Sequence, residues 1–470
     1  MTPPPSPAVE GGAAVPGHSG RARHVLLFPL PYQGHINPML RLAGVLHARG
    51  FAVTVFHTHF NAPDAARHPE HRFVAVPDGM SGRPPPVSVD DVVKHIHALN
   101  GACEAAFRDR LAAVLAEYSR DAVTCFVADA HLLRMVEVAR RLTVPTLVLR
   151  TGSAACFAGF LAYPLLCDKG YLPSSQLDMA VSELPPYRVR DLMHIGRDGH
   201  ELMCELVARA VAAVKLSSGL ILNTFDALEA PELAKLRRDL AVPVFDIGPL
   251  HKFSPAADGS LLHQDRSCLE WLDTQVPESV LYVSFGSLAC MGARELVETA
   301  WGIAGSGVPF LWVVRPGLVG GRAPDEAAAR LLPEGFEAAT RRRGVVVAWA
   351  PQEEVLRHRA VGGFWTHNGW NSTTESLGEG VPMLCRPNFG DQMGNARYVE
   401  HVWKAGFEVA GGELERATVE AAIRRLMTES DGGEMRARAR ELKKAAAECT
   451  GKASSSEMAI VKMVTHMLSL

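Results

Sequence analysis

The sequence predicts an α/β protein with two domains, each built around a parallel β-sheet. A chain of 470 residues is too long for one ordinary hydrophobic core, so two domains are expected. Each half also contains continuous apolar segments that alternate with helical patterns, which is typical of strands buried on both faces and connected through helices. The clearest strand–helix–strand units span residues 24–57 and 280–314.

In the first unit, residues 24–30 predict a buried strand, residues 39–49 a helix closed by Gly50, and residues 51–57 the next strand. The loop PYQGHINP separates the first strand from the helix and carries His35. Ligands bind at the carboxyl ends of parallel strands, so His35 lies where a site is expected. The alternative is a loop histidine that is satisfied by a backbone carbonyl.

A second polar residue follows a buried strand in the same half. Residues 123–128 (VTCFVA) predict that strand, and Asp129 ends it; a helix over 131–142 and a strand over 145–149 come next. Asp129 has two interpretations. It can cap the following helix, or its carboxylate can orient the His35 imidazole and stabilise the protonated ring. The two roles are compatible.

Composition sets the domain limits. Residues 1–22 are rich in Pro, Gly and Ala and predict a disordered leader, without the apolar run of a signal peptide. The first domain covers residues 23–249, and a stretch of Pro, Gly, Ser, Ala and Asp at 250–265 predicts the linker. The second domain covers residues 266–452, and an amphipathic helix at 453–470 ends the chain.

The second domain begins with a strand at 280–285 that runs into Gly286 and Ser287. A glycine turn after a buried strand can present backbone N–H groups and a hydroxyl to a phosphate. A helix at 293–305 and a strand at 310–314 complete the unit. A bare Gly-Ser turn would be unremarkable on its own.

Residues 349–392 hold the most informative stretch of the chain. An apolar strand at 361–365 runs through Thr366 to Gly369, and a short helix opens at Ser372. This arrangement directs backbone N–H groups and the positive end of a helix dipole at one point, which suits a phosphate. Ser372 and Glu375 also match a capping box, in which Glu375 would only close its own helix.

Several side chains in this stretch can recognise a sugar nucleotide. Trp349 offers a flat face for a base, His367 and Asn371 can donate hydrogen bonds to a phosphate, and Asp391 with Gln392 suits sugar hydroxyls. Each of these residues alone has an ordinary structural explanation. Their combination favours a binding site.

Composition excludes several other classes of protein. The net charge of −3 gives no basic footprint for nucleic acid or an anionic membrane. Nine cysteines without a C-x-x-C pair suggest neither a disulfide framework nor a zinc site, which favours a reducing, cytoplasmic setting. No stretch has eighteen strongly apolar residues, so stable membrane insertion is not expected.

The stretch 349–392 resembles the signature box of plant family 1 UDP-glycosyltransferases, which act on small molecules. The matching residues are Trp349, Pro351, Gln352, His367, Gly369, Trp370, Asn371, Ser372, Glu375, Gly380, Pro382, Pro387, Asp391 and Gln392. The resemblance covers nearly the whole chain from about Arg23. The segments FPLPYQGHINPML, FHTHFNAP and LRTGS are similar to those of enzymes that act on steviol glycosides, cytokinins or benzoxazinoids.

The resemblance implies a GT-B fold, in which two Rossmann-like domains face each other across a cleft. The first domain would bind the acceptor, the second would bind the UDP-sugar, and the last helix would cross back to the first domain. His35 would be the catalytic base, paired with Asp129. The UDP-sugar contacts would be Ser287, Trp349, Ala350, Gln352, His367, Gly369, Trp370, Asn371, Ser372, Glu375, Asp391 and Gln392.

Within that set the resemblance implies distinct roles. Trp349 would stack on uracil beside the Ala350 backbone, and Gln352 with Glu375 would hold the ribose. The diphosphate would meet Ser287, His367, Asn371 and Ser372. Trp370, Asp391 and Gln392 would hold the hexose, and glutamine at position 392 is the family's usual residue for glucose. The acceptor would contact Gln33, Gly34, Thr151, Gly152, Ser153 and Phe157, although core packing explains Phe157 equally well.

The expected activity is therefore an inverting transfer of glucose from UDP-glucose to a hydroxyl or hydroxamate of a small hydrophobic plant metabolite. No metal is expected, because no Asp-x-Asp pair is present, and UDP-glucose is the only co-substrate. The expected partners are the UDP-sugar and the acceptor, and the expected state is a monomer. The alternatives are a cytokinin-type N-glucosyltransferase, a non-catalytic sugar-nucleotide-binding protein, and an NAD(P)-dependent or phosphorylase-type enzyme.

Overall fold

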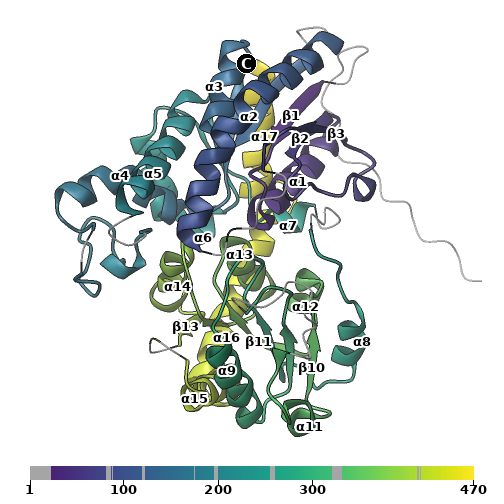
Figure 1. Ribbon diagram of the computed structural model, residues 1–470, viewed down its shortest axis with the longest axis vertical. Helices are drawn as coiled ribbons and strands as arrows, with labels where there is room; N and C mark the ends of the chain where they lie inside the picture. The colour runs from purple at the N-terminus through teal and green to yellow at the C-terminus, as the bar shows by residue number, and fades with distance from the viewer. Residues whose placement is uncertain are drawn as a thin grey trace, which may run out of the picture.

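The computed structural model describes residues 23–80, 86, 88–118, 122–173, 175–194, 199–254, 260–319, 331–409, 412 and 414–470. The expected leader, residues 1–22, and the linker residues 255–259 lie outside this described part. The chain forms two α/β domains, one above the other in Figure 1, which confirms the predicted fold class.

The first domain contains a seven-stranded parallel sheet in the order β3-β2-β1-β4-β5-β6-β7. Its strands are β1 His24–Phe28, β2 Ala52–Thr58, β3 Arg72–Val76, β4 Val123–Asp129, β5 Thr146–Arg150, β6 Leu220–Leu222 and β7 Val244–Asp246. Its helices are α1 Gln33–His47, α2 Val89–Glu117, α3 Leu133–Arg141, α4 Ala154–Asp168, α5 His200–Leu216 and α6 Asp226–Asp239, with short 3₁₀ turns η1 Ala65–Arg67 and η3 Val189–Asp191. The central strands β1 and β4 are buried along almost their whole length because helices cover both faces of the sheet.

The second domain contains a six-stranded parallel sheet in the order β10-β9-β8-β11-β12-β13. Its strands are β8 Val280–Ser284, β9 Phe310–Val313, β10 Gly344–Val347, β11 Val361–Thr366, β12 Met383–Cys385 and β13 Gly406–Glu408. The helices from the linker onward are α7 Leu250–Phe253, α8 Ser267–Asp273, α9 Ala293–Ser306, α11 Phe336–Thr340, α12 Gln352–Arg357, α13 Trp370–Glu379, α14 Gln392–His401, α15 Arg416–Thr428, α16 Ser430–Thr450 and α17 Ser455–Ser469.

The strand orders place one topological switch point in each domain. In the first sheet the order reverses between β1 and β4, and in the second sheet it reverses between β8 and β11. A crevice opens beyond the carboxyl ends of the strands at such a point, because the flanking connections leave in opposite directions. His35 and Asp129 follow β1 and end β4, and Ser287 and His367 follow β8 and β11, so both pairs flank a switch point.

The last helix, α17, belongs to the core of the first domain. Ile460, Met463 and Met467 are buried with Val25 and Leu27 of β1. In Figure 1 the yellow C-terminal helix runs upward from the lower domain, and the C-terminus lies at the top of the upper one. The chain therefore passes between the domains a second time, after α16.

The predicted start of α1 at residue 39 is wrong, because the helix begins at Gln33. The sequence prediction treated Pro38 as a break, since a helical proline cannot donate to the carbonyl four residues earlier. That carbonyl belongs to Gly34, and it accepts a hydrogen bond from Asn371 Nδ2 of the second domain at 3.0 Å. The longer helix puts His35 on its first turn rather than in a loop.

Candidate active site

A cavity of about 630 Å³ lies between the two domains at their switch points. It is lined from the first domain by residues after β1 and β5, including His35, and from the second by residues after β8, β10 and β11. All the residues expected to contact the UDP-sugar line this cavity: Ser287, Trp349, Ala350, Gln352, His367, Gly369, Trp370, Asn371, Ser372, Glu375, Asp391 and Gln392. The two halves of the expected site therefore share one space.

His35 and Asp129 form a short polar contact between side chains at the first-domain wall. His35 Nδ1 lies 2.6 Å from Asp129 Oδ2, and the Thr151 hydroxyl lies 3.0 Å from the same nitrogen. Because Nδ1 is engaged, Nε2 is the ring nitrogen left to accept a proton. The His35 side chain is 21% exposed and lines the cavity, while Asp129 is 1% exposed and lies behind it.

The Asp129 carboxylate is held ionised. Burial alone would raise its pKa, but the His35 charge and hydrogen bond, with a contribution from His131, outweigh burial and lower the pKa below its usual value. Its second oxygen accepts the His131 N–H at 2.9 Å. Since α3 begins at Leu133, Asp129 closes a turn before the helix and does not cap it, contrary to one of the two interpretations of the sequence.

His367 at the second switch point is a neutral imidazole. Burial and, to a smaller extent, the positive charge of Arg315 lower its pKa to about 4. Two glycines make room for the ring: a Cβ atom on Gly286 would lie 2.6 Å from it, and one on Gly369 would lie 2.5 Å from its Nε2. Gly286 also adopts a φ of +72°, which disfavours any other residue.

Gly286→Ala is expected to lower the free energy of unfolding by about 1–3 kcal/mol, because alanine would be strained at this φ and would collide with His367. Chemical denaturation measures the loss. Gly101→Ala is the matched control, since Gly101 is exposed in α2 with nothing within 4 Å of an added Cβ, and that variant should be neutral or slightly more stable. Equal losses in both variants would contradict this account of Gly286.

The N-terminus of α13 faces the cavity beside His367. The helix begins at Trp370, with Gly369 as its N-cap, so the capping box of Ser372 and Glu375 is not formed. Asn371, expected to donate to a phosphate, lines the cavity, and its amide donates one hydrogen bond to the Gly34 carbonyl across the cleft. The free N–H groups of this first turn are left to meet an anion.

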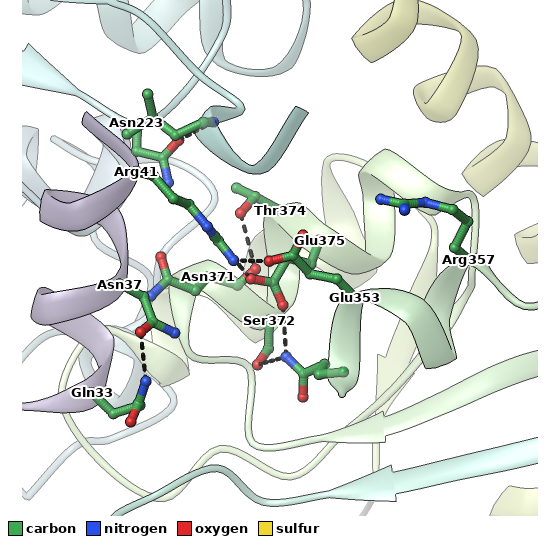
Figure 2. A network of polar contacts seen from close by, with 12 residues as sticks. Gln33, Asn37, Arg41, Asn223, Glu353, Arg357, Asn371, Ser372, Thr374 and Glu375 are labelled. Atoms are coloured by element: carbon green, nitrogen blue, oxygen red, sulfur yellow. Dashed lines mark hydrogen bonds and ion pairs between the residues drawn. The ribbon is translucent and has the colours of Figure 1, made fainter. Parts of the chain in front are cut away.

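The side chains of α12 and α13 form a connected polar network (Figure 2). Gln352 Nε2 donates to Ser372 Oγ at 2.9 Å and to Glu375 Oε2 at 2.8 Å. The other Glu375 oxygen accepts from Arg41 Nη1 at 3.1 Å, and Arg41 also pairs with Glu353. Glu375 is therefore fixed from both sides with its carboxylate at the cavity wall.

Arg41 is a site residue that the sequence analysis missed. It extends from α1 of the first domain into the second domain, as Figure 2 shows, and it is 3% exposed. A buried guanidinium requires carboxylate partners, and Glu353 and Glu375, which pair with it, both come from the other domain. The available signal was an arginine inside the apolar segment MLRLAGVL, but the sequence gives no indication of its partners.

Two tryptophans of the box are placed differently from each other. Trp349 is half-buried at the cavity, and its indole N–H donates to Ser260 Oγ in the linker at 2.9 Å. The Trp370 indole is buried and donates to the Asn223 carbonyl of the first domain at 2.8 Å. The Trp370 side chain thus joins the two domains, and Trp370 also lines the cavity, so that its contact with the hexose stays a prediction.

Asp391 and Gln392 begin α14 at the boundary between the domains. Burial raises the pKa of Asp391, and the Arg150 guanidinium opposes this effect. A Cβ atom on Gly152 would lie 3.1 Å from both Arg150 Nη2 and Asp391 Oδ2. Glycine at this position therefore leaves room for these two side chains. Arg150, at the end of β5, is a second buried cation that sequence reasoning did not assign to the site.

The acceptor wall is only partly where the sequence placed it. Gln33, Gly34, Thr151 and Gly152 line the cavity, although Gln33 Oε1 accepts the Leu261 N–H at 2.7 Å and so also binds the linker. Ser153 and Phe157 lie outside the cavity: Ser153 caps α4 by accepting the Cys156 N–H, and Phe157 is fully buried in the core. The apolar lining comes instead from α2, α5 and the loop before α5: Val89, Val92, Val93, Ile96, Met193, Met203 and Leu206.

Two further features concern the helices and the cysteines of the described residues. Among the described residues, no helix combines the length and the apolar character needed to cross a bilayer. All nine cysteines fall in the described part of the chain and are free thiols.

Comparison with known proteins identifies the family of this chain. Residues 24–435 match the family described as "UDP-glucoronosyl and UDP-glucosyl transferase". The DIMBOA UDP-glucosyltransferase BX8 of Zea mays is 51% identical over 448 residues, which cover 92% of this chain and 96% of that protein. UDP-glycosyltransferase 76B1 of Arabidopsis thaliana is 41% identical over 447 residues, which cover 95% of this chain and 98% of that protein.

Similarity to solved structures indicates the same family. Phytolacca americana UGT2, complexed with UDP-2fluoro-glucose and pterostilbene, is similar with a TM-score of 0.81 and 27% identity, over 95% of this chain and 100% of that one. A UDP-glucose: anthocyanidin 3-O-glucosyltransferase in complex with UDP is similar with a TM-score of 0.82 and 26% identity, over 96% of this chain and 100% of that one. The chain thus belongs to the UDP-glucoronosyl and UDP-glucosyl transferase family, as a plant-type UDP-glycosyltransferase with the GT-B fold.

Proposed function

We propose that the protein transfers glucose from UDP-glucose, with inversion at the anomeric carbon, to an acidic hydroxyl of a small, largely apolar plant metabolite. The observation that carries the proposal is the His35–Asp129 pair, at 2.6 Å, on the wall of the same cavity as the box residues. A base and a sugar-nucleotide site on opposite walls of one cleft are what a direct displacement needs.

The donor would lie along the second domain. Trp349 would stack on the uracil, with the Ala350 backbone at its edge, and Gln352 and Glu375 would hold the ribose hydroxyls. The diphosphate would lie at the N-terminus of α13, where His367, Ser372 and Ser287 line the cavity. These donors would stabilise the charge that develops on UDP as it leaves.

The acceptor hydroxyl would lose its proton to His35 Nε2 as its oxygen attacks the anomeric carbon from the face opposite UDP. Asp129 keeps the proton on Nδ1, which leaves the Nε2 lone pair in the cavity and stabilises the imidazolium that forms. The bond to the UDP oxygen breaks in the same displacement. The pair of electrons goes to the diphosphate, and the acceptor proton stays on His35 until it is released to solvent.

For the acceptor, we infer a bicyclic or similarly compact molecule that carries a cyclic hydroxamic acid, of the benzoxazinoid class. Two relatives at 51% and 49% identity are described as glucosyltransferases for DIMBOA, and the apolar side chains of α2 and α5 suit a flat ring. The polar residues Thr151 and His35, which contact each other, line the same cavity and suit a single O–H group.

The test is a mass-spectrometric screen of UDP-glucose against hydroxamic acids, phenolics, terpenoids and cytokinins, with UDP release measured in parallel. The proposal expects an O-glucoside of a hydroxamic acid as the main product. A product glucosylated on a purine nitrogen would favour the N-glucosyltransferase alternative. Binding of UDP-glucose without UDP release from any acceptor would indicate a non-catalytic binding protein.

Gln392→His is expected to lower kcat/KM for UDP-glucose by about tenfold, the equivalent of one lost hydrogen bond to the hexose. Gln392 Oε1 accepts the N–H groups of Asn388 and Phe389 at 2.9 and 3.1 Å, which leaves its amide N–H₂ for the sugar. Competition between UDP-glucose and UDP-galactose measures the effect, and the UDP dissociation constant serves as the control. An unchanged ratio of the two products would remove Gln392 from the hexose contacts.

A further inference from the structure

Three metal-ligating side chains meet outside the cleft, between α4 and α5. Cys167 lies near the end of α4, and His200 and Cys204 lie one turn apart on α5, so that both face the same side. The two helices pack against each other and lie side by side in Figure 1. None of these three residues lines the cleft cavity, so the cluster is independent of the transfer site.

The distances within this cluster are close to those around a bound cation. His200 Nε2 lies 3.5 Å from Cys204 Sγ and 4.0 Å from Cys167 Sγ. One ligand atom from each of the three side chains lies within 4.8 Å of the others. Tetrahedral zinc, with bonds of about 2.3 Å to sulfur and 2.0 Å to nitrogen, separates its ligands by roughly 3.5–4 Å. Side-chain adjustments of at most about an ångström would therefore complete the geometry.

The ligand chemistry selects the type of cation. Two thiolates and an imidazole prefer borderline and soft metals such as Zn²⁺ over Mg²⁺ or Ca²⁺, which prefer oxygen ligands. A metal ion binds cysteine as the thiolate, so metal binding would release the thiol protons.

We propose that Cys167, His200 and Cys204 form a binding site for a thiophilic divalent cation such as Zn²⁺, with a fourth position open to solvent. All three side chains are half-buried, which provides both an entry path and room for a water ligand. The bound cation links α4 to α5, and each cysteine gives up its proton to solvent as the metal–sulfur bond forms.

The position of the cluster gives the cation a consequence for the acceptor. Met203 and Leu206, on α5 between and beyond the ligands, line the cavity. On the α4 side, the Tyr163 hydroxyl donates to the Met193 carbonyl at 3.0 Å, and Met193 also lines the cavity. Fixing α4 to α5 therefore restricts the acceptor wall, while the donor wall in the other domain stays as it was.

The experiment uses the full chain, reduced and stripped of metal with a chelator, and titrated with Co²⁺. We expect a thiolate-to-cobalt charge-transfer band that saturates at about one equivalent, with release of about two protons. Zn²⁺ should displace Co²⁺ with a preference of about tenfold or more. Zn²⁺ should also raise the Tm of the reduced chain.

Cys204→Ser and Cys290→Ser form the matched pair of variants, because both replace half-buried cysteines but only the first removes a ligand. The band should disappear in Cys204→Ser and persist in Cys290→Ser. A wild-type chain without the band, or a band unchanged in Cys204→Ser, overturns the proposal. If Cys204→Ser unfolds, His200→Asn replaces it and the same two outcomes decide.

Discussion

His35→Ala is expected to lower kcat by about 10²–10⁴-fold with an alcohol acceptor and to leave the dissociation constant for UDP unchanged. The variant removes the only ring nitrogen that the Asp129 pair directs into the cavity, while the residues proposed to hold UDP belong to the other domain. The Gly34 carbonyl that meets Asn371 is a backbone group and survives the change. Steady-state kinetics and calorimetry with UDP measure the two quantities separately.

The loss in His35→Ala should depend on the acidity of the acceptor. A hydroxamic acid ionises more readily than an alcohol, so it needs less help from a base, and its rate should fall less. His47→Ala is the matched control, because His47 ends the same helix on the exposed side and should change neither rate. Equal turnover by wild type and His35→Ala with the alcohol would eliminate His35 as the base.

Arg41→Met should produce the largest loss of stability and a selective loss of donor affinity. Removing the buried guanidinium takes a cationic partner from both Glu353 and Glu375, and a buried pair broken in this way typically costs about 3–5 kcal/mol. Because Glu375 then keeps only the Gln352 side of its two fixing contacts, the dissociation constant for UDP should rise by about tenfold or more. Denaturation and calorimetry measure these changes.

Two comparisons separate this effect from general damage. A UDP analogue that lacks the ribose hydroxyls should bind wild type and Arg41→Met equally well, because Glu375 would have nothing to contact. Arg49→Met is the control just after the same helix: it removes a more exposed ion pair with Glu457, worth less than about 1 kcal/mol, and should leave UDP binding intact. If both nucleotides lost affinity equally in Arg41→Met, Arg41 would not act through Glu375.

The secondary structure was predictable where short-range patterns determine it. Continuous apolar runs such as residues 24–30 and 123–128 indicated strands buried on both faces, and β1 and β4 are such strands. The start of α1 was missed because Pro38 reads as a break within the chain. Only the second domain shows why it is tolerated, since Asn371 satisfies the carbonyl that Pro38 leaves free.

The same distinction between short-range patterns and contacts made on folding applies to the candidate site. The residues expected to hold the donor could be picked out because all of them except Ser287 lie in one continuous segment, 349–392, and all of them line the cavity. The apolar residues of the acceptor wall were not predictable, because side chains from α2, α5 and the loop before α5 come together only in the folded chain. Phe157 illustrates the problem: an aromatic residue near a strand end is equally suited to a wall or to a core, and here it is core.

The packing of α17 against the first domain limits how the enzyme can move. Because the polypeptide passes from one lobe to the other both at the linker and again after α16, two tethers hold the lobes together. Two domains that are connected at two points can rotate about the axis through those points, but they cannot separate. The domains then open for exchange of substrate and product by a hinge rotation about this axis. Deleting α17 would remove one of the two connections and would also expose the apolar side chains of the first domain beside β1.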